Sequence, residues 1–406
     1  MQILDSLKKY FNNTPFEIYL IYILPISLIA GSLVTNLNVL LLIIFYLFKQ
    51  SRIGIYEDLK DKFILFLFVI WIYLILNSIF IAENITSHVR AFGFIKFILL
   101  TMSIVFFLKK NNDFIEKKII LIWAIIFGIV SADLIFEFIF GFNSIGYSSN
   151  YSGRLSGFKG DEMNIGGYYF GFSTFVLLFF FDKQKLFFLS LLSILGISLL
   201  IGERSNLIKI LILYLTIFFI FYDISLKKKL LYFFVIIFSM SLFISSYPNF
   251  KSRFYHHIAK DIDINSLENT IKTNQYLLHY STAYEVFRQN KLFGVGIKNY
   301  RNVSTDDEYQ IFDGRNGGTI HPHQVHFEFL SELGILGYIL IIGYFVFILS
   351  ISIKKYILSK NINILVYSLF IIVTLIPILP SGSFFTTYGA TMFWINCSFL
   401  FYNLKK

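Results

Sequence analysis

Residues 63–82, FILFLFVIWIYLILNSIFIA, form an uncharged apolar run that is long enough to cross a lipid bilayer as a helix. Similar runs recur through most of the chain of 406 residues, of which 56% are hydrophobic and only 15% are charged. This composition, with a mean hydropathy of +0.68, is far from that of a soluble domain. The sequence therefore predicts an all-α integral membrane protein.

The apolar runs predict about twelve transmembrane helices. Their expected bounds are 17–35, 36–48, 63–82, 89–108, 119–141, 166–181, 186–201, 206–222, 230–247, 327–353, 364–380 and 384–402. A mostly polar stretch separates the ninth run from the tenth. We therefore expect nine transmembrane helices in residues 1–247, a loop domain in residues 248–325 and three more helices in residues 326–406.

Lysine and arginine residues cluster in alternate connections between the apolar runs. The clusters lie in residues 8–9, 49–62, 109–118, 183–185, 227–229, 354–360 and 405–406. Because positively charged short loops stay in the cytoplasm, both termini are predicted to be cytoplasmic and the loop domain periplasmic or extracellular. The net charge of +10 forms no continuous basic stripe along the sequence, so no nucleic-acid partner is expected.

Few positively charged residues remain in short connections on the predicted outer side, and these are candidates for binding an anion. Arg90 follows AENITSHV, Arg154 lies in SGRLSGFKG, and Arg204 lies in the short turn GERSN. An arginine at the end of a membrane helix also commonly reaches headgroup phosphates, which is an alternative interpretation of Arg90. Arg204, beside its expected partner Glu203, would be held at the membrane face, where a guanidinium suits a phosphate or diphosphate.

The loop domain has the composition of a folded unit and not of a flexible linker. Asn265 and Glu268 have the spacing of a capping box. The stretch that follows, residues 266–290, predicts an amphipathic helix that includes His279 and that packs on the protein or lies on the membrane. The glycines of FGVGIK predict a tight turn, because a lone G-x-G is too weak a signal for a nucleotide site.

Three histidines, His321, His323 and His326, precede the apolar run that starts at residue 327. Pro322 favours the first turn of a helix, so we expect a helix that begins in the loop domain, with His323 and His326 on one face. The spacing of these histidines and Glu328 supplies no clear third ligand, so no metal site is predicted. An imidazole with a pKa near neutrality could take a proton from a sugar hydroxyl, although interfacial histidines without a chemical role are also common.

The stretch HQVHFEFLSELGILG resembles the motif of the O-antigen ligase and O-antigen polymerase superfamily, in which His followed by Asn, Ser or Gln precedes G-x-x-G. Here the motif residues are His323, Gln324, Gly334 and Gly337. The segments KLFGVGIKNYRNV, RLSGFKGDEMNIGGYYF and GERSN are also similar to segments of that family. The expected architecture, about twelve helices with one large periplasmic loop, resembles the family's GT-C-like fold.

The resemblance implies a membrane glycosyltransferase of the bacterial inner membrane, acting on the periplasmic face. Its donor would be an undecaprenyl-diphosphate-linked glycan, its acceptor a sugar hydroxyl of the lipid A core (ligase) or of a growing glycan (polymerase), and the anomeric centre would be inverted. It would need no metal or nucleotide cofactor. By the same resemblance His323 would be the general base, and Arg204 and Arg154 would bind the diphosphate. Further candidates for the site are His321, His279, Arg90, Arg301 and Glu328. The sequence does not decide between ligase and polymerase.

One feature of the loop domain departs from the family pattern. Ligase-like members carry an arginine early in the amphipathic loop helix, whereas TNQYLLHY contains His279 and no arginine. Four other cations of the loop domain are possible substitutes. They are Arg253, Arg288, Lys291 and Arg301.

A transporter, such as a flippase for the same lipid-linked oligosaccharide, is the competing class of protein. Charged residues deep within membrane helices often mark transport pathways. Asp133 and Glu137, four residues apart near the outer end of an expected helix, are the main residues of that kind. A third interpretation is a membrane scaffold whose polar outer surface binds other proteins.

Overall fold

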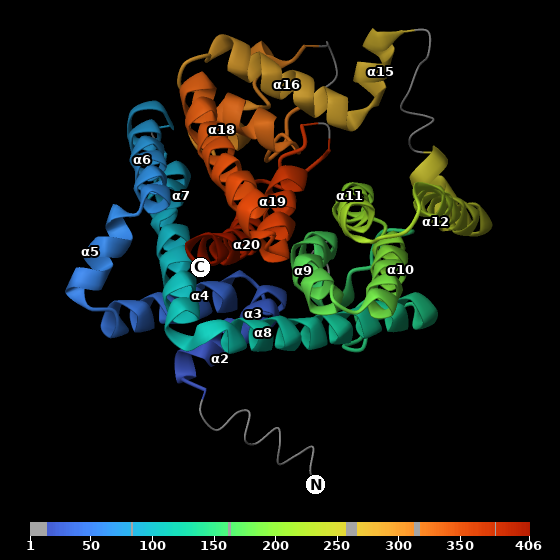
Figure 1. Cartoon of the computed structure of the whole chain (residues 1–406). Coiled ribbons are helices and arrows are strands. Elements are labelled where there is room, and N and C mark those ends of the chain that lie inside the picture. Colours follow the sequence, from blue (N-terminus) through green and yellow to red (C-terminus); the bar gives the residue numbers. More distant parts are fainter. Residues whose placement is uncertain (1–13, 83, 161–163, 257–265, 312–316, 378) are drawn as a thin grey trace.

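The computed structural model describes residues 14–82, 84–160, 164–256, 266–311, 317–377 and 379–406 (Figure 1). All regular secondary structure in these residues is helical. The helices are α2 (Phe16–Tyr22), α3 (Leu24–Ala30), α4 (Ser32–Lys49), α5 (Arg52–Lys60), α6 (Lys62–Asn77), α7 (Ile85–Gly93), α8 (Ile95–Phe140), α9 (Ile165–Phe180), α10 (Gln184–Ile201), α11 (Arg204–Phe221), α12 (Leu226–Ser246), α13 (Pro248–Lys251), α15 (Leu267–Thr273), α16 (Gln275–Gln289), α17 (Tyr300–Val303), α18 (Val325–Ser359), α19 (Ile362–Thr374) and α20 (Thr387–Lys405). The prediction of an all-α membrane protein is confirmed.

The expected number of about twelve transmembrane helices is not confirmed. Within the described residues, eight segments are long and apolar enough to cross a membrane. They are 32–49, 62–82, 85–111, 114–140, 184–201, 204–221, 226–246 and 325–359. Two further apolar helices, α9 and α19, are shorter, and α20 is not among the eight. The expected first span is instead two short helices, α2 and α3, which join at Ile23.

The expected fourth and fifth spans are the two arms of one continuous helix, α8. No proline or glycine occurs between Ile95 and Phe127 to interrupt the helical hydrogen bonds, so the polar stretch between the arms stays helical. Figure 1 shows that the two arms run in different directions. The helix ends at Gly141, which has the left-handed conformation (φ +80°) typical of a helix C-terminus.

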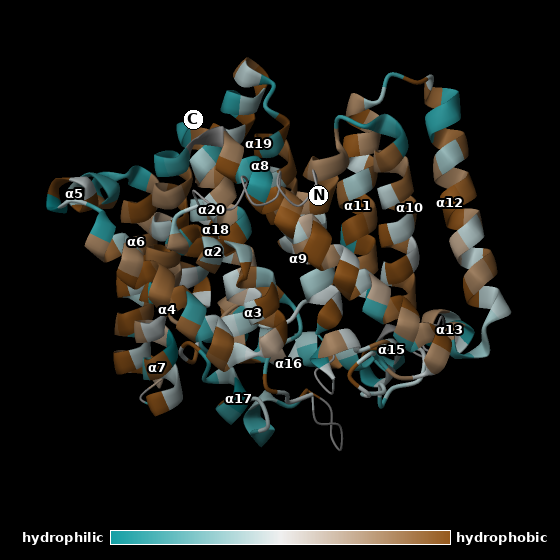
Figure 2. Ribbon diagram, turned by 90° about the horizontal axis from the view of Figure 1, so that it is seen from below, coloured by the Kyte–Doolittle hydropathy of each residue, from teal (hydrophilic) through white to brown (hydrophobic). Residues whose placement is uncertain are grey.

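The lysine-rich connections lie together at one end of the bundle. Lys49 pairs with Glu17 at 2.7 Å, and Lys405 pairs with Asp61 at 2.9 Å. In Figure 2, α5 and the C-terminus lie at this end, whereas α13, α15, α16 and α17 lie at the opposite end. Which compartment each end faces stays a prediction, and so do the boundaries of the loop domain.

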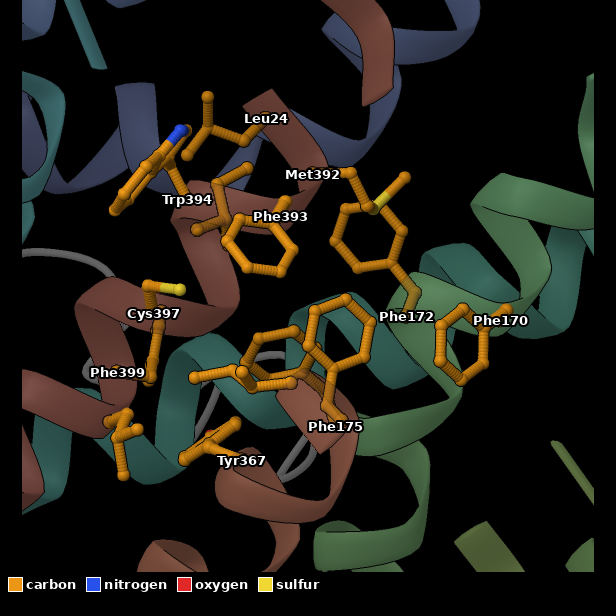
Figure 3. Packing of buried hydrophobic residues seen from close by; sticks show 14 of the residues in the cluster. Leu24, Phe170, Phe172, Phe175, Tyr367, Met392, Phe393, Trp394, Cys397 and Phe399 are labelled. Carbon is orange, nitrogen blue, oxygen red and sulfur yellow. The ribbon is translucent and has the colours of Figure 1, made fainter. Parts of the chain in front are cut away.

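In the core of the bundle, aromatic side chains of α8, α9, α19 and α20 pack against one another (Figure 3). The Trp123 ring lies 4.6 Å from Phe175 and 5.4 Å from Phe399, measured between centroids. At Gly171 a Cβ atom would collide with the side chain of Met392, so this glycine lets α9 and α20 approach closely. These contacts fix the last helix of the chain against the centre of the bundle.

Helix α18 is broken at Gly334, whose backbone (φ 66°, ψ −171°) is not helical. Glycine is required there, because φ is positive and a Cβ atom would collide with the Leu292 carbonyl. The break leaves backbone groups without helical partners, and the segment 291–296 supplies new ones. The bonds run from Val295 N to Ser331 O (2.9 Å), from Gly296 N to Glu332 O (2.8 Å) and from Ile335 N to Lys291 O (2.8 Å).

The expected capping box of the loop domain is not the cap that forms. Asn265 lies outside the described residues, and Ser266 caps α15 by accepting a hydrogen bond from Asn269 N at 3.1 Å. The predicted amphipathic helix is divided into α15 and α16. Helix α16 packs on the start of α18, where the rings of Tyr280 and Phe327 stack at 5.2 Å.

Candidate functional site

Helix α18 begins at Val325 and not near Pro322 as expected. Gln324 is the N-cap residue, since its Oε1 atom accepts hydrogen bonds from two backbone N–H groups of the first turn at 2.6 and 3.0 Å. His323 therefore lies in the loop and shares no helix face with His326. The prediction based on the proline was wrong because this side-chain cap sets the start of the helix.

The backbone of His323 is held on both sides. Its φ of +58° lies in the left-handed region, which is uncommon for residues other than glycine. Its carbonyl oxygen accepts a hydrogen bond from Ser381 N at 2.7 Å, and Gln324 Nε2 donates to Pro377 O at 2.8 Å. Among the described residues, the imidazole ring itself has no hydrogen-bond partner, so its position is defined while its nitrogen atoms stay free to react.

Three imidazole rings gather at this point. The His323 ring lies 4.0 Å from that of His321 and 5.4 Å from that of His279, which stacks on it at 27°. His279 Nδ1 lies 2.7 Å from Gly317 O. Since a carbonyl oxygen only accepts, this Nδ1 atom carries a hydrogen. Helix α16 thus brings His279, a candidate by sequence, against the motif histidine.

The pKa of His323 is lowered to about 4, mainly by burial and also by the neighbouring imidazoles of His321 and His279, while Glu328 opposes the shift. Burial also lowers the pKa of His321 to about 4, with the charges of Lys298, His279 and Arg301 acting in the same sense. These values are below the near-neutral pKa expected from the sequence. Both imidazoles are therefore neutral at pH 7, the state in which a histidine accepts a proton.

His326, the third histidine of the motif region, is occupied by the protein. Its Nδ1 lies 3.0 Å from Tyr338 Oη, and its Nε2 lies 2.7 Å from Leu375 O. Within the described residues, no group of three or more His, Cys, Asp or Glu side chains has an arrangement suited to a metal ion. His326 thus anchors the start of α18 to α19.

Three arginines form a second cluster, around the turn between α10 and α11. Arg154 pairs with Glu203 at 3.0 Å, and Arg253 Nε donates to Gly202 O at 2.6 Å. Glu203 was expected to pair with Arg204, but it pairs with Arg154. Among the described residues, Arg204 has no ion-pair or hydrogen-bond partner for its guanidinium, so one cation of this cluster is available to a ligand.

The arginine cluster and the histidine cluster meet at Tyr276. The pKa of Arg253 is lowered to about 10, mainly by burial and also by the positive charges of Arg154 and Arg204, whereas Tyr276 and Glu203 act in the opposite direction. The ring of Tyr276 also packs edge-on against that of His323, with centroids 5.8 Å apart. The positive charges gathered around Arg253 favour the binding of an anion at this place.

Of the four loop-domain cations considered from the sequence, Arg253 is the one that lies in the cluster with Arg154 and Arg204. Arg288 is instead held by Glu285 at 2.7 Å on the exposed face of α16. The carbonyl of Lys291 bonds to the broken part of α18. Arg301 is exposed and acts on His321, as described above, and Arg90 Nη1 lies 3.4 Å from Thr387 Oγ1.

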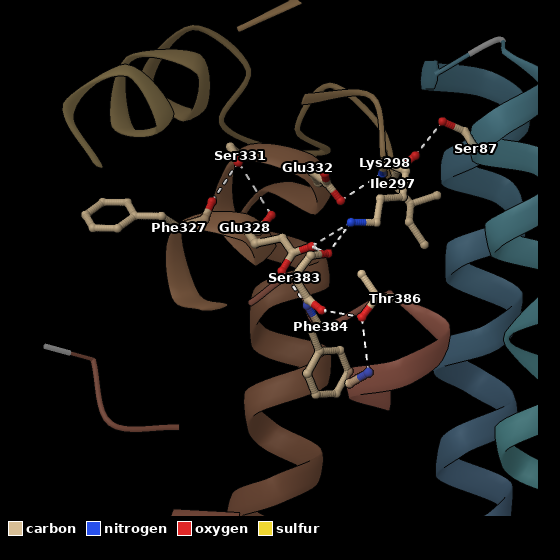
Figure 4. Close-up of polar contacts among 11 residues, drawn as sticks. Ser87, Ile297, Lys298, Phe327, Glu328, Ser331, Glu332, Ser383, Phe384 and Thr386 are labelled. Carbon is tan, nitrogen blue, oxygen red and sulfur yellow. Dashed lines mark hydrogen bonds and ion pairs between the residues drawn. The ribbon is translucent and has the colours of Figure 1, made fainter. Parts of the chain in front are cut away.

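Glu328, a candidate by sequence, is buried in a salt bridge (Figure 4). Its Oε1 atom lies 3.3 Å from Lys298 Nζ and accepts a hydrogen bond from the Ser383 hydroxyl, while its Oε2 accepts from Phe384 N at 2.7 Å. Lys298 N also donates to Glu332 Oε2 at 2.8 Å. The Lys298–Glu328 pair therefore ties the loop domain to α18 and to the segment before α20.

The role of Lys298 was missed in the sequence. Glu328 and Glu332 are four residues apart in an apolar helix, and such a pair of carboxylates needs a buried cation. That requirement is the signal that would have indicated a nearby lysine or arginine. Lys298 supplies the cation from a turn in which its own φ is +58°.

Asp133 and Glu137 accept hydrogen bonds from the loop that follows α8. Asp133 Oδ1 accepts from Ser144 N at 2.9 Å, and Glu137 accepts from Ser156 N at 3.1 Å and from Gly157 N at 2.6 Å. These bonds satisfy the backbone of a loop that would otherwise be unpaired at the membrane. The two carboxylates on which the transporter interpretation rested thus have a structural use.

The structure is that of a polytopic helical membrane protein with adjoining histidine and arginine clusters at the loop-domain end of the bundle. A family model described as O-antigen ligase matches residues 187–342, from the start of α10 into α18. The match includes Arg204, Arg253, His279 and His323, whereas Arg154 precedes it. No curated protein matches the chain. This part of the chain is therefore similar to the O-antigen ligase family, in agreement with the motif, and that family acts in glycan transfer during surface polysaccharide assembly.

Proposed function

We propose that the protein is an inverting glycosyltransferase that moves an undecaprenyl-diphosphate-linked, O-antigen-type glycan to a sugar hydroxyl at the periplasmic face of the bacterial inner membrane. The observation that supports this proposal is that Tyr276 packs on the imidazole of His323 and also interacts electrostatically with Arg253, whose charged neighbours are Arg154 and Arg204. A base next to a cluster of cations is the combination that such a transfer needs. The acceptor is either the lipid A core or a growing glycan.

In the proposed reaction, His323 takes the proton of the acceptor hydroxyl while the hydroxyl oxygen attacks C1 of the donor sugar. The new C1–O bond forms as the bond between C1 and the phosphate oxygen breaks. The undecaprenyl diphosphate leaves with the electron pair of that bond. Attack from the side opposite the leaving group inverts the anomeric centre.

The arginine cluster would stabilise the negative charge that develops on the diphosphate. Guanidinium groups bind phosphate oxygens through paired hydrogen bonds, and they are more effective where water is excluded. Arg204 is free among the described residues, and Arg253 is held by a backbone carbonyl, so the two can approach one ligand from different elements. Arg253 would thereby replace the loop-helix arginine of the ligase-like family members.

The proposal is tested by following both products with purified protein in lipid vesicles that contain a lipid-linked glycan donor and an acceptor. A transferase releases undecaprenyl diphosphate in a one-to-one ratio with glycosylated acceptor. A flippase would move the donor across the bilayer unchanged. Transbilayer movement of intact donor without any release of the carrier would contradict the proposal.

The pH dependence of transfer is expected to show the lowered pKa of His323. The base form is the active one, so the transfer rate constant should be nearly constant from about pH 6 to 8 and should fall on acidification, with a midpoint near 4. Replacing His321 with Gln removes a neighbouring imidazole and should move that midpoint upward. Initial rates measured across this range check both statements, and a wild-type midpoint near 6.5 would contradict them.

Stability needs a separate check in this experiment. His321 and His323 bind protons less readily in the folded protein than in the unfolded chain. The free energy of unfolding should therefore decrease, and the protein become less stable, as the pH falls from about 6.5 toward 4. Loss of activity by unfolding is distinguished from protonation of the base by returning each sample to pH 7. Full recovery of the rate indicates protonation.

Replacing Arg204 or Arg253 with Gln should lower kcat/KM for the donor by about 10- to 100-fold, since each loses a charge-assisted hydrogen bond to the diphosphate. Arg288→Gln is the matched control, because Arg288 lies in the same loop domain but is held by Glu285 on the exposed surface. Steady-state kinetics with the donor varied and the acceptor saturating measure the effect. Equal losses in all three variants would argue against a diphosphate site at Arg204 and Arg253.

A further inference from the structure

A second pair of cations, Arg90 and Lys96, is separate from the arginine cluster, and both side chains contact the hydroxyl group of Thr387. Lys96 Nζ lies 3.3 Å from Thr387 Oγ1, the same atom that Arg90 Nη1 approaches at 3.4 Å, and it also donates to Asn36 Oδ1 at 2.9 Å. All three contacts are to neutral groups. Among the described residues, neither Arg90 nor Lys96 has a carboxylate within ion-pair distance.

Arg90 and Lys96 lie close together at the end of a membrane segment, where a nearby negative charge would stabilise them. Arg90 is in α7 and Lys96 is in the first turns of α8, at the loop-domain end of a segment that is apolar enough to span a membrane. Both side chains are partly buried, so water screens their mutual repulsion only incompletely. Arginine and lysine at the end of a membrane helix reach toward the headgroup layer, where phosphoryl groups supply the negative charge.

Arg301 extends this pair toward the histidines. Asn84, just before α7, donates to Asn299 Oδ1 at 2.9 Å and so holds the chain that leads to Arg301 against α7. The positive charge of Arg301 acts on both Arg90 and His321. Arg301 is exposed and has no ion-pair partner among the described residues. The cations Lys96, Arg90 and Arg301 therefore form a group that reaches the neighbourhood of His321.

The backbone limits how far this group lies from the proposed base. His323 O accepts a hydrogen bond from Ser381 N, and Thr387 follows six residues later. Six residues span at most about 20 Å even when fully extended. The arginine cluster at Arg253 is a separate group, since it is built on the turn between α10 and α11 and approaches His323 through Tyr276.

We propose that Arg90, Lys96 and Arg301 form a second phosphoryl-binding site, which holds the phosphorylated lipid that anchors the acceptor. This inference rests on the proposed function, in which donor and acceptor are both lipid-anchored. With the donor diphosphate at the arginine cluster and the acceptor lipid at this second site, the acceptor hydroxyl would be brought to His323 between them. Holding both reactants in place is itself a large source of rate enhancement.

The first experiment measures binding of a short phosphorylated lipid, dioctanoyl phosphatidic acid, to the full-length protein in neutral detergent. Wild type should bind two molecules. The double variant Arg90→Gln/Lys96→Gln and the double variant Arg204→Gln/Arg253→Gln should each retain one site, with affinity at the altered site reduced about 10- to 100-fold. Two unchanged sites in the Arg90→Gln/Lys96→Gln variant would overturn the proposal.

Two comparison probes identify the source of the phosphoryl group. Dioctanoylglycerol lacks the phosphate and should bind at neither site, and inorganic phosphate lacks the acyl chains and should bind much more weakly than the lipid. Equal affinity for inorganic phosphate would show a site for a free anion and would overturn the assignment to a lipid. Thr387→Val, which keeps both cations, should bind as wild type does, and Arg90→Lys should restore most of the affinity lost in Arg90→Gln.

The second experiment separates the acceptor from ordinary membrane lipid. In the transfer assay, Arg90→Gln/Lys96→Gln should raise KM for the acceptor by about 10- to 100-fold and leave KM for the donor and kcat within about twofold of wild type. Loss of probe binding with an unchanged acceptor KM would show that the site holds a membrane lipid and would overturn the proposal. Wild-type protein that binds two probe molecules but transfers no glycan would contradict the proposed function, not the existence of the second site.

Discussion

The variant His323→Ala is expected to lower the transfer rate constant by about 10²- to 10⁴-fold, the usual contribution of a general base. The ring has no hydrogen-bond partner among the described residues, and the loop is held by the backbone bond to Ser381, so the variant should fold normally. Single-turnover rates with purified protein measure the chemical step directly. A variant that folds and transfers at the wild-type rate would exclude His323 as the base.

His326→Gln is the matched control for this variant, because it removes another imidazole from the same short segment. The ring nitrogens of His326 bond to Tyr338 and to a backbone carbonyl, so the expected effect is a loss of stability with little change in the rate of the folded protein. If both variants lose transfer equally, the segment as a whole, and not the imidazole of His323, is what matters.

The same variant in cells would distinguish the two possible activities. When a strain that lacks the gene carries His323→Ala, a ligase defect should leave long glycan chains on the lipid carrier. A polymerase defect should instead leave the lipid A core with a single repeat unit. Electrophoresis of surface glycolipids, together with analysis of the carrier-linked glycan, shows which of the two accumulates.

The helical class could be predicted from the sequence, whereas the helix ends could not. Apolar runs of bilayer length identify the elements because the hydrocarbon core imposes that length. The break at Gly334 depends on another segment, since the chain around Val295 must supply backbone partners for it. The start of α18 likewise depends on Gln324, whose amide bonds to both the first turn and Pro377. Such long-range contacts leave no periodic signal.

In the candidate site too, some residues could be predicted from the sequence and others could not. His323 and Arg204 were indicated by a short motif and by the rarity of positive charge on one side of the membrane. The choice of Arg253 over the other loop cations was not possible, because it depends on how residues 248–325 fold back on the turn at Gly202. The structural role of Glu328 could not be predicted, because its buried partner, Lys298, lies 30 residues away in the sequence.

The second large effect is expected from Lys298→Met. The Lys298 and Glu328 side chains are 2% and 1% exposed, and removing the cation leaves the carboxylate of Glu328 buried without its ion-pair partner. Breaking a buried ion pair in this way costs about 3–5 kcal/mol. Thermal unfolding in a neutral detergent should therefore show a markedly lower midpoint for Lys298→Met than for wild type.

The matched control is the double variant Lys298→Met/Glu328→Gln. The glutamine removes one buried charge and keeps an oxygen that can accept from Phe384 N, so the double variant should regain part of the lost stability. A double variant less stable than Lys298→Met would show that the charge pair is not the cause.

The ion pair also connects the stability of α18 to the position of the base. Glu328 binds Ser383 and Phe384, and these residues lie in the segment whose Ser381 holds the His323 carbonyl. Lys298→Met should thus reduce kcat in the molecules that remain folded, and the double variant should recover rate and stability together.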